Sequence, residues 1–122
     1  MNDPIETVLA FCASWDRLDF DAISNALHEN IHYHNKPLCP VDGKDAVMGY
    51  ILSAGPYESS FWEVLNIAVD GNVVMTERVD HFVKDGKKIA LEVMGVFEIE
   101  NGLICVWRDY FDLALYRAQI AK

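Results

Sequence analysis

Positive charge is scarce in this chain, which carries ten lysine and arginine residues against 19 aspartates and glutamates, a formal net charge of −9. The phosphate backbone of a nucleic acid and an anionic membrane surface would both repel such a protein. We therefore expect neither nucleic acid nor a membrane as a partner.

Cysteines are few, and long apolar runs are missing. Cys12, Cys39 and Cys105 are odd in number and form no metal-ligand spacing, which suits unpaired thiols in a reducing compartment. No apolar run approaches the roughly 20 residues of a membrane helix, and the acidic start does not resemble a signal peptide. These absences predict a cytoplasmic protein.

Motifs that hold a cofactor or a metal are missing as well. No glycine-rich phosphate loop is present, and His32 and His34 have no carboxylate set beside them. We expect these histidines to be solvated or to cap backbone groups, and we expect no cofactor and no metal.

The composition that remains is that of a globular protein. Hydrophobic residues make up 52% of the chain and charged residues 24%, which predicts one domain over residues 1–122. The slight apolar surplus indicates a buried cavity lining or a subunit interface, and we expect a homodimer in which one sheet face packs against a second copy.

Helix signals dominate the first half of the chain. Asp3 and the proline after it start a helix that ends near Arg17, and Asp19 can cap a shorter second helix. A short strand is expected over 31–35 and a third helix over 45–52.

From residue 61 onward, strand-like runs alternate with turn signals at 70–72, 85–86 and 101–102. Helices followed by an antiparallel meander predict an α+β domain. We expect a curved mixed, mainly antiparallel sheet that forms a cone with an apolar interior, with the N-terminal helices packed on one face.

Charged residues fall on strand positions that should face this interior. Residues i and i+2 of a strand share a face, so Arg78 and Asp80 are neighbours, and Tyr33 shares a face with Asn35. On the last strand, Asp109 is the only charge in an alternating row, and a lone carboxylate there needs a partner. That row consists of Leu103, Cys105, Trp107, Asp109 and Phe111.

Turn lengths decide whether Arg78 and Asp109 meet. A two-residue loop at 101–102 places Met94 opposite Asp109. A two-residue loop at 85–86 then pairs Arg78 with Val93 and separates the charges onto opposite faces. A three-residue loop or one β-bulge instead pairs Arg78 with Met94 and forms a single row. The alternative is that Arg78 and Asp80 form a surface pair, since charges on exposed strands are common.

Three segments, YHN at 33–35, TERVD at 76–80 and WRDYFD at 107–112, resemble the catalytic segments of limonene-1,2-epoxide hydrolases, in the family's order. The similarity in helix and strand layout covers nearly the whole chain. It implies a SnoaL-like, or cystatin-like, fold with a deep pocket, which is usually dimeric. The fold hosts enzymes and non-enzymes alike.

Carried onto this chain, the resemblance implies that Tyr33, Asn35 and Asp109 hold a water and that Asp109 removes its proton. Asp80 would protonate the oxygen of a small apolar epoxide, and Arg78 would bridge the two carboxylates. An epoxide opens at neutral pH when a proton reaches its oxygen while water attacks carbon, so an acid and a base must act together.

Three alternatives stay open at this point. Asp109 could attack carbon directly and form an ester, although the water-holding residues favour one step. A ketosteroid-isomerase-like or polyketide-cyclase-like enzyme could use the same fold with a carboxylate base, and a non-catalytic module could bind a small molecule there. An arginine between two acids favours the hydrolase.

Overall fold

The computed structural model describes residues 3–121 of the chain. Its elements, in chain order, are α1 (Pro4–Asp16), α2 (Phe20–Asn25), β1 (Leu27–Asn35), β2 (Val41–Asp42), α3 (Lys44–Ala54), β3 (Ser59–Asp70), β4 (Val73–Lys84), β5 (Lys87–Glu100), β6 (Leu103–Tyr110) and α4 (Leu113–Ile120). One six-stranded sheet has the order β2-β1-β6-β5-β4-β3, in which only β1 and β6 run parallel.

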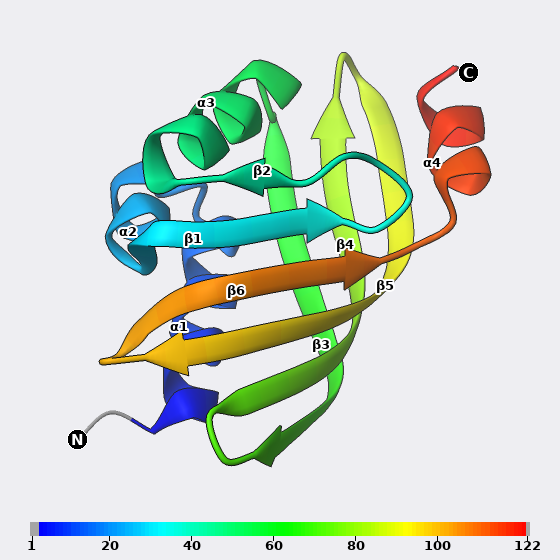
Figure 1. Cartoon of the computed structure of the whole chain (residues 1–122). Helices are drawn as coiled ribbons and strands as arrows, with labels where there is room; N and C mark the ends of the chain where they lie inside the picture. The colour runs from blue at the N-terminus through cyan, green and yellow to red at the C-terminus, as the bar shows by residue number, and fades with distance from the viewer. Residues whose placement is uncertain (1–2, 122) are drawn as a thin grey trace.

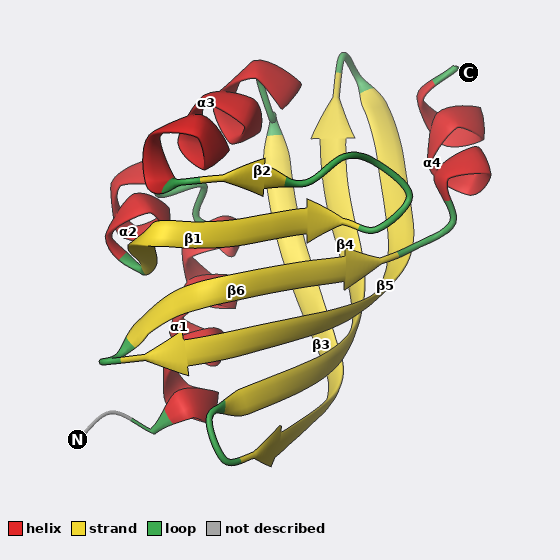
Figure 2. Ribbon diagram, viewed as in Figure 1, coloured by secondary structure: helices red, strands yellow, loops and turns green. Residues whose placement is uncertain are grey.

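The predicted fold class is confirmed. The sheet is strongly curved, and α1, α2 and α3 lie along its concave side and upper end (Figures 1 and 2). Side chains of Asp3 and Asp19 cap α1 and α2, where they accept hydrogen bonds from the N–H groups of Ile5 and Ala22 at 2.9 and 3.1 Å. In residues 3–121 no helix is long and apolar enough to cross a membrane.

The structure differs from the sequence-based elements in several places. Strand β1 begins at Leu27, four residues before the predicted strand, and α3 extends to Ala54. The short strand β2 and the last helix, α4, were not predicted. Asp112 caps α4 by accepting a hydrogen bond from the N–H of Leu115 at 3.1 Å, a signal that the sequence carries.

The β4–β5 and β5–β6 hairpins, which decide the register of the site, both have two-residue loops. Asp85 and Gly86 have φ values of 52° and 72°, and Asn101 and Gly102 have 52° and 78°, the left-handed pair of a type I′ turn. Arg78 therefore pairs with Val93 across β4 and β5. Under the sequence argument this pairing should have separated Arg78 from Asp109.

The expected separation of Arg78 from Asp109 is wrong because a β-bulge lies in the hairpin of β5 and β6. Between β5 and β6 the register shifts by one residue at Cys105, whose thiol contacts the carbonyl oxygen of Glu98 at 3.3 Å. Gly95, rather than Met94, therefore stands opposite Asp109. The bulge also corrects the predicted row on β6, since Ile104 is fully buried while Leu103 and Cys105 are only half-buried.

The core lies between α1 and the concave face of the sheet. Phe11 of α1 makes edge-to-face contacts with Trp62, Phe97 and Trp107, with ring centroids 5.0 to 6.0 Å apart. All three rings belong to one buried cluster, which also includes residues of α2, α3 and β1. This cluster forms the wall behind the pocket.

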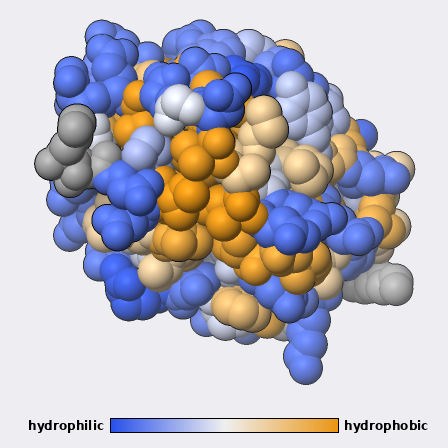
Figure 3. All heavy atoms as spheres, turned by 90° about the horizontal axis from the view of Figure 1, so that it is seen from below, coloured by the Kyte–Doolittle hydropathy of each residue, from blue (hydrophilic) through white to orange (hydrophobic). Residues whose placement is uncertain are grey.

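Part of the apolar surplus remains on the surface. Met75, Met94 and Tyr110 lie on the convex face of the sheet and are 46%, 48% and 45% exposed. In the view from below, apolar atoms gather in the middle of the face, with polar atoms around them (Figure 3).

Candidate active site

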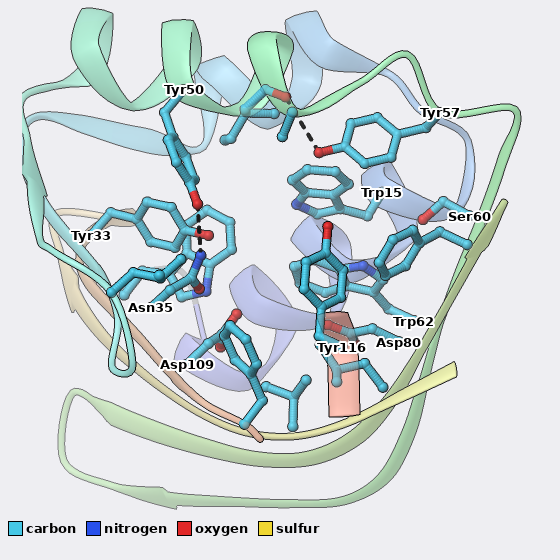
Figure 4. A pocket seen from close by; sticks show the side chains of 18 of the residues that line it. Trp15, Tyr33, Asn35, Tyr50, Tyr57, Ser60, Trp62, Asp80, Asp109 and Tyr116 are labelled. Carbon is cyan, nitrogen blue, oxygen red and sulfur yellow. Dashed lines mark hydrogen bonds between the residues drawn. The ribbon is translucent and has the colours of Figure 1, made fainter. Parts of the chain in front are cut away.

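An open pocket lies between the concave sheet face and the helices (Figure 4). Most of its wall is aromatic or aliphatic. Its polar lining groups are Tyr33, Asn35, Tyr50, Tyr57, Ser60, Asp80, Asp109 and Tyr116. The structure thus brings four of the five predicted site residues to one cavity, and the fifth, Arg78, lies directly behind Asp80 and Asp109.

Arg78 joins the two carboxylates. Its Nε and Nη2 donate to the two oxygens of Asp80, both at 2.9 Å, and its Nη1 and Nη2 donate to the two oxygens of Asp109 at 3.4 and 3.2 Å. The side chain is fully buried and does not line the pocket. Arg78 is therefore a positioning residue that orients both acids from behind.

Thr76 and Gly95 make room for this bridge. The hydroxyl of Thr76 accepts the remaining Arg78 N–H at 3.0 Å, so all five guanidinium donors are used. Gly95 stands between Thr76 and Asp109 in the sheet. A Cβ there would overlap Nη1 of Arg78 and lie 2.8 Å from Oδ1 of Asp109, so the guanidinium crosses β5 where a side chain would be.

An aromatic ring holds the plane of the guanidinium. The central carbon of Arg78 lies 4.3 Å from the centroid of the Trp62 ring, and Trp62 stacks on Trp15 with centroids 5.0 Å apart. Cation–π contact in a desolvated place stabilises the charge and restricts rotation of the planar group. Burial lowers the pKa of Arg78, but the charges of Asp109 and Asp80 raise it by more, so the side chain stays charged.

The two carboxyls differ in their surroundings. Burial raises the pKa of Asp80, and the charge of Asp109 adds to this, while the charge and hydrogen bonds of Arg78 lower it by less. Asp109 instead lies next to β1, with Asn35 as its register partner. The raised pKa favours the protonated form of Asp80, the carboxyl that lies farther from Asn35.

Tyr33 and Asn35 project into the pocket from β1, as alternation predicted (Figure 4). Burial, followed by the charge of Asp109, raises the pKa of Tyr33 well above its usual range, so the phenol keeps its proton. The amide nitrogen of Asn35 donates to the hydroxyl of Tyr50 at 3.4 Å. This contact turns the amide oxygen of Asn35 toward the other side, as an acceptor.

The remaining titratable groups near the pocket are not placed for this chemistry. His32 and His34 lie on the opposite face of β1, where their rings contact Asp42 at 2.6 Å and the carbonyl of Leu38 at 2.8 Å. Burial raises the pKa of Cys12 to about 12, so its thiol is no nucleophile. Within residues 3–121, no group of three or more His, Cys, Asp or Glu side chains converges on a metal position.

Several residues of the site were missed from the sequence. Thr76 lies in the same alternating row as Arg78, so a signal for it existed. A single glycine inside a strand, such as Gly95, often marks a close approach of another group. Tyr50 and Tyr116 reach the pocket through tertiary packing, and no local pattern indicates this.

The model of the limonene-1,2-epoxide hydrolase catalytic domain matches residues 2–121. The chain belongs to this family. Epoxide hydrolase EphG of Mycobacterium tuberculosis is 30% identical over 106 residues, which cover 87% of this chain and 71% of that protein. The matched range of residues 2–121 includes Tyr33, Asn35, Arg78, Asp80 and Asp109.

Solved structures place this family member in a wider fold group. An M. tuberculosis LEH-like epoxide hydrolase has 28% identity and a TM-score of 0.85, with 97% of this chain and 89% of that one covered. A putative polyketide cyclase from Xanthomonas campestris has 19% identity and a TM-score of 0.86, with 96% of each chain covered. The second likeness concerns the fold alone, so the side chains of the site must distinguish the functions.

Proposed function

We propose that this protein is an epoxide hydrolase that adds water to a small apolar epoxide in one step, by general acid and general base catalysis. The observation that carries the proposal is the fully buried Arg78, which holds Asp80 and Asp109 side by side at the pocket floor. An acid and a base at a fixed separation are what epoxide opening requires.

The base side is the side of β1. A water beside Asp109 donates one hydrogen bond to this carboxylate and the other to the amide oxygen of Asn35, and it accepts a hydrogen bond from the hydroxyl of Tyr33. One lone pair then remains, and it points into the pocket. The register of Asn35 opposite Asp109 and the raised pKa of Tyr33 support this arrangement.

The acid side is Asp80, whose raised pKa supports its role as the proton donor. As the water oxygen bonds to an epoxide carbon, the carbon–oxygen bond on the opposite side of that carbon breaks. Asp109 takes the proton from water and Asp80 gives its proton to the epoxide oxygen, which yields a vicinal diol. The cycle closes when a proton returns from Asp109 to Asp80.

The lining supports an apolar substrate. Trp15, Trp62, Phe82, Trp107 and Phe111 present hydrophobic surface around the two acids. Such walls gain free energy from covering an apolar skeleton and exclude bulk water from the reacting atoms. The fold is also that of polyketide cyclases, so turnover has to be shown directly.

The test is diol formation from cyclohexene oxide by the parent and by two isosteric variants. Asp80→Asn cannot deliver an acidic proton and Asp109→Asn cannot take one, so each should lose most activity, about 100-fold or more. The double variant should be little worse than either, because the two groups act as a unit. Melting temperature serves as the folding control.

Folded Asp80→Asn and Asp109→Asn proteins with parental diol formation would show that the site is wrongly assigned. A parent that binds the epoxide without converting it would instead support the small-molecule binding module.

A further inference from the structure

The pocket mouth is bounded by α4, the helix that the sequence did not predict. In Figure 1 this helix stands beside the upper part of β5, separate from the other helices. Leu113 and Tyr116, three positions apart and so on one helix face, line the pocket, and Tyr116 stands across the opening from Tyr50 (Figure 4). No residue of α4 is buried. The helix therefore has little packing of its own to keep it in place.

The place where α4 docks is an unpaired edge of β5. Strand β6 pairs with β5 only from Met94 to Glu100, so the backbone of Ala90 lies beyond the last rung. Gln119 fills this gap. The N–H of Ala90 donates to Oε1 of Gln119 at 2.8 Å, and Nε2 of Gln119 donates to the carbonyl of Ala90 at 2.9 Å. One side-chain amide thus supplies the donor and acceptor of a missing strand.

The other contacts of α4 with the strands each join a single pair of groups. Lys84 donates to the hydroxyl of Tyr116 at 3.4 Å, and the rings of Phe82 and Tyr116 lie 6.2 Å apart. Lys87 donates to the carbonyl of Ile120 in the last turn. The Gln119 pair is the two-point contact that fixes both the position and the rotation of the helix.

We propose that Gln119 is a specificity-determining residue: by holding α4 against β5, it keeps Tyr116 and Leu113 over the mouth and limits the size of epoxide that the pocket accepts. The inference rests on the proposed epoxide hydrolysis. A compact epoxide fits beneath the closed helix, whereas a long or branched one needs α4 displaced, and this displacement breaks the amide pair with Ala90.

The experiment compares kcat/KM for cyclohexene oxide with that for the bulkier trans-stilbene oxide, and follows hydrogen exchange at the Ala90 amide. Gln119→Ala should raise the ratio of trans-stilbene oxide to cyclohexene oxide turnover roughly tenfold, since two hydrogen bonds of ordinary strength are lost. The Ala90 amide, deprived of its acceptor, should exchange faster. Gln119→Glu keeps an acceptor for this N–H but loses the donor, so it should shift the ratio less.

Two further variants separate the mouth from the clamp. Tyr116→Ala removes the wall while leaving Gln119 in place, so it should also favour trans-stilbene oxide, with exchange at Ala90 unchanged. Arg117→Ala truncates an exposed side chain of the same helix and should change neither quantity. If Gln119→Ala is too unstable to assay, Tyr116→Ala alone still tests whether α4 limits substrate size.

An unchanged substrate ratio in Gln119→Ala and Tyr116→Ala, or unchanged exchange at Ala90 in Gln119→Ala, would overturn the inference. Failure of the proposed function looks different, because the parent would then hydrolyse neither epoxide. In that case the same variants are compared by quenching of the tryptophan fluorescence from Trp15, Trp62 and Trp107 in the pocket wall. A selective gain in affinity for trans-stilbene oxide would support the role of α4, and its absence would refute it.

Discussion

Gly95→Ala is the smallest change that should disable the site without touching an acid. The new methyl group would overlap Nη1 of Arg78 and approach Asp109 Oδ1 to 2.8 Å and Thr76 Oγ1 to 3.0 Å. A guanidinium at the end of a long side chain can normally move aside. Here it cannot do so freely, because five hydrogen bonds and the face of Trp62 hold it.

The expected effect on stability is moderate. Overpacking a buried place costs about 1–3 kcal/mol. The backbone of Gly95 lies in an ordinary strand conformation, so replacing glycine by alanine there recovers about 0.5–1 kcal/mol of conformational entropy. We expect a net loss of about 1–2 kcal/mol, or roughly 3–10 °C in Tm for a chain of this size.

The expected effect on activity is larger. A shift of the guanidinium by about 1 Å moves both acids, and misplacement of that size costs about 100-fold in rate. Gly49→Ala is the matched control, since a Cβ at Gly49 in α3 would meet no atom within 4 Å. It should leave kcat unchanged and raise stability slightly. A Gly95→Ala protein with parental kcat/KM and Tm would refute the view that Arg78 needs this gap.

Three more predictions concern titration, mechanism and assembly. Because burial raises the pKa of Asp80, ionising this carboxyl costs more free energy in the folded than in the unfolded state. Both kcat/KM and Tm should therefore fall as pH rises through the raised pKa of Asp80. The variant Asp80→Asn should remove this fall in Tm. If kcat/KM and Tm of the parent protein do not fall with rising pH, Asp80 does not carry the proton. A single turnover in 18O-labelled water should place the label in the diol and none in the protein, whereas label in Asp109 by peptide mass spectrometry would indicate an ester intermediate. We also expect a homodimer through the convex sheet face, where Met75, Met94 and Tyr110 are exposed; a monomer by light scattering at micromolar concentration would contradict this.

The fold was predictable because local rules and the global arrangement agree for most of the chain. Asp3 and Asp19 cap the helices they were expected to cap, and the Asp-Gly and Asn-Gly pairs form the turns that they favour. Alternation placed Arg78, Asp80, Tyr33 and Asn35 on the concave face. These assignments depend on a few neighbouring residues, which a sequence displays directly.

The meeting of Arg78 and Asp109 was not predictable with the same certainty. It depends on one extra residue at Cys105, and a bulge there has no sequence signature as specific as an Asn-Gly turn. The need for an irregularity was correctly inferred, but it was assigned to the wrong hairpin. The contacts between helix α4 and strand β5, such as that of Gln119 with Ala90, link residues 29 positions apart. No local sequence pattern could therefore show them.

The charge balance of the site supports the proposed hydrolysis. With Asp80 protonated and Asp109 ionised, Arg78 makes the trio neutral, which suits burial. Epoxide hydration moves one proton from Asp80 to the substrate and another from water to Asp109. The net charge of Arg78, Asp80 and Asp109 together is therefore zero both before and after the chemical step. An isomerase or a cyclase instead develops an enolate, which needs free hydrogen-bond donors. Every N–H of Arg78 already has a partner, so Arg78 itself has no donor to offer an oxyanion, and only groups such as the Tyr33 hydroxyl could donate to one.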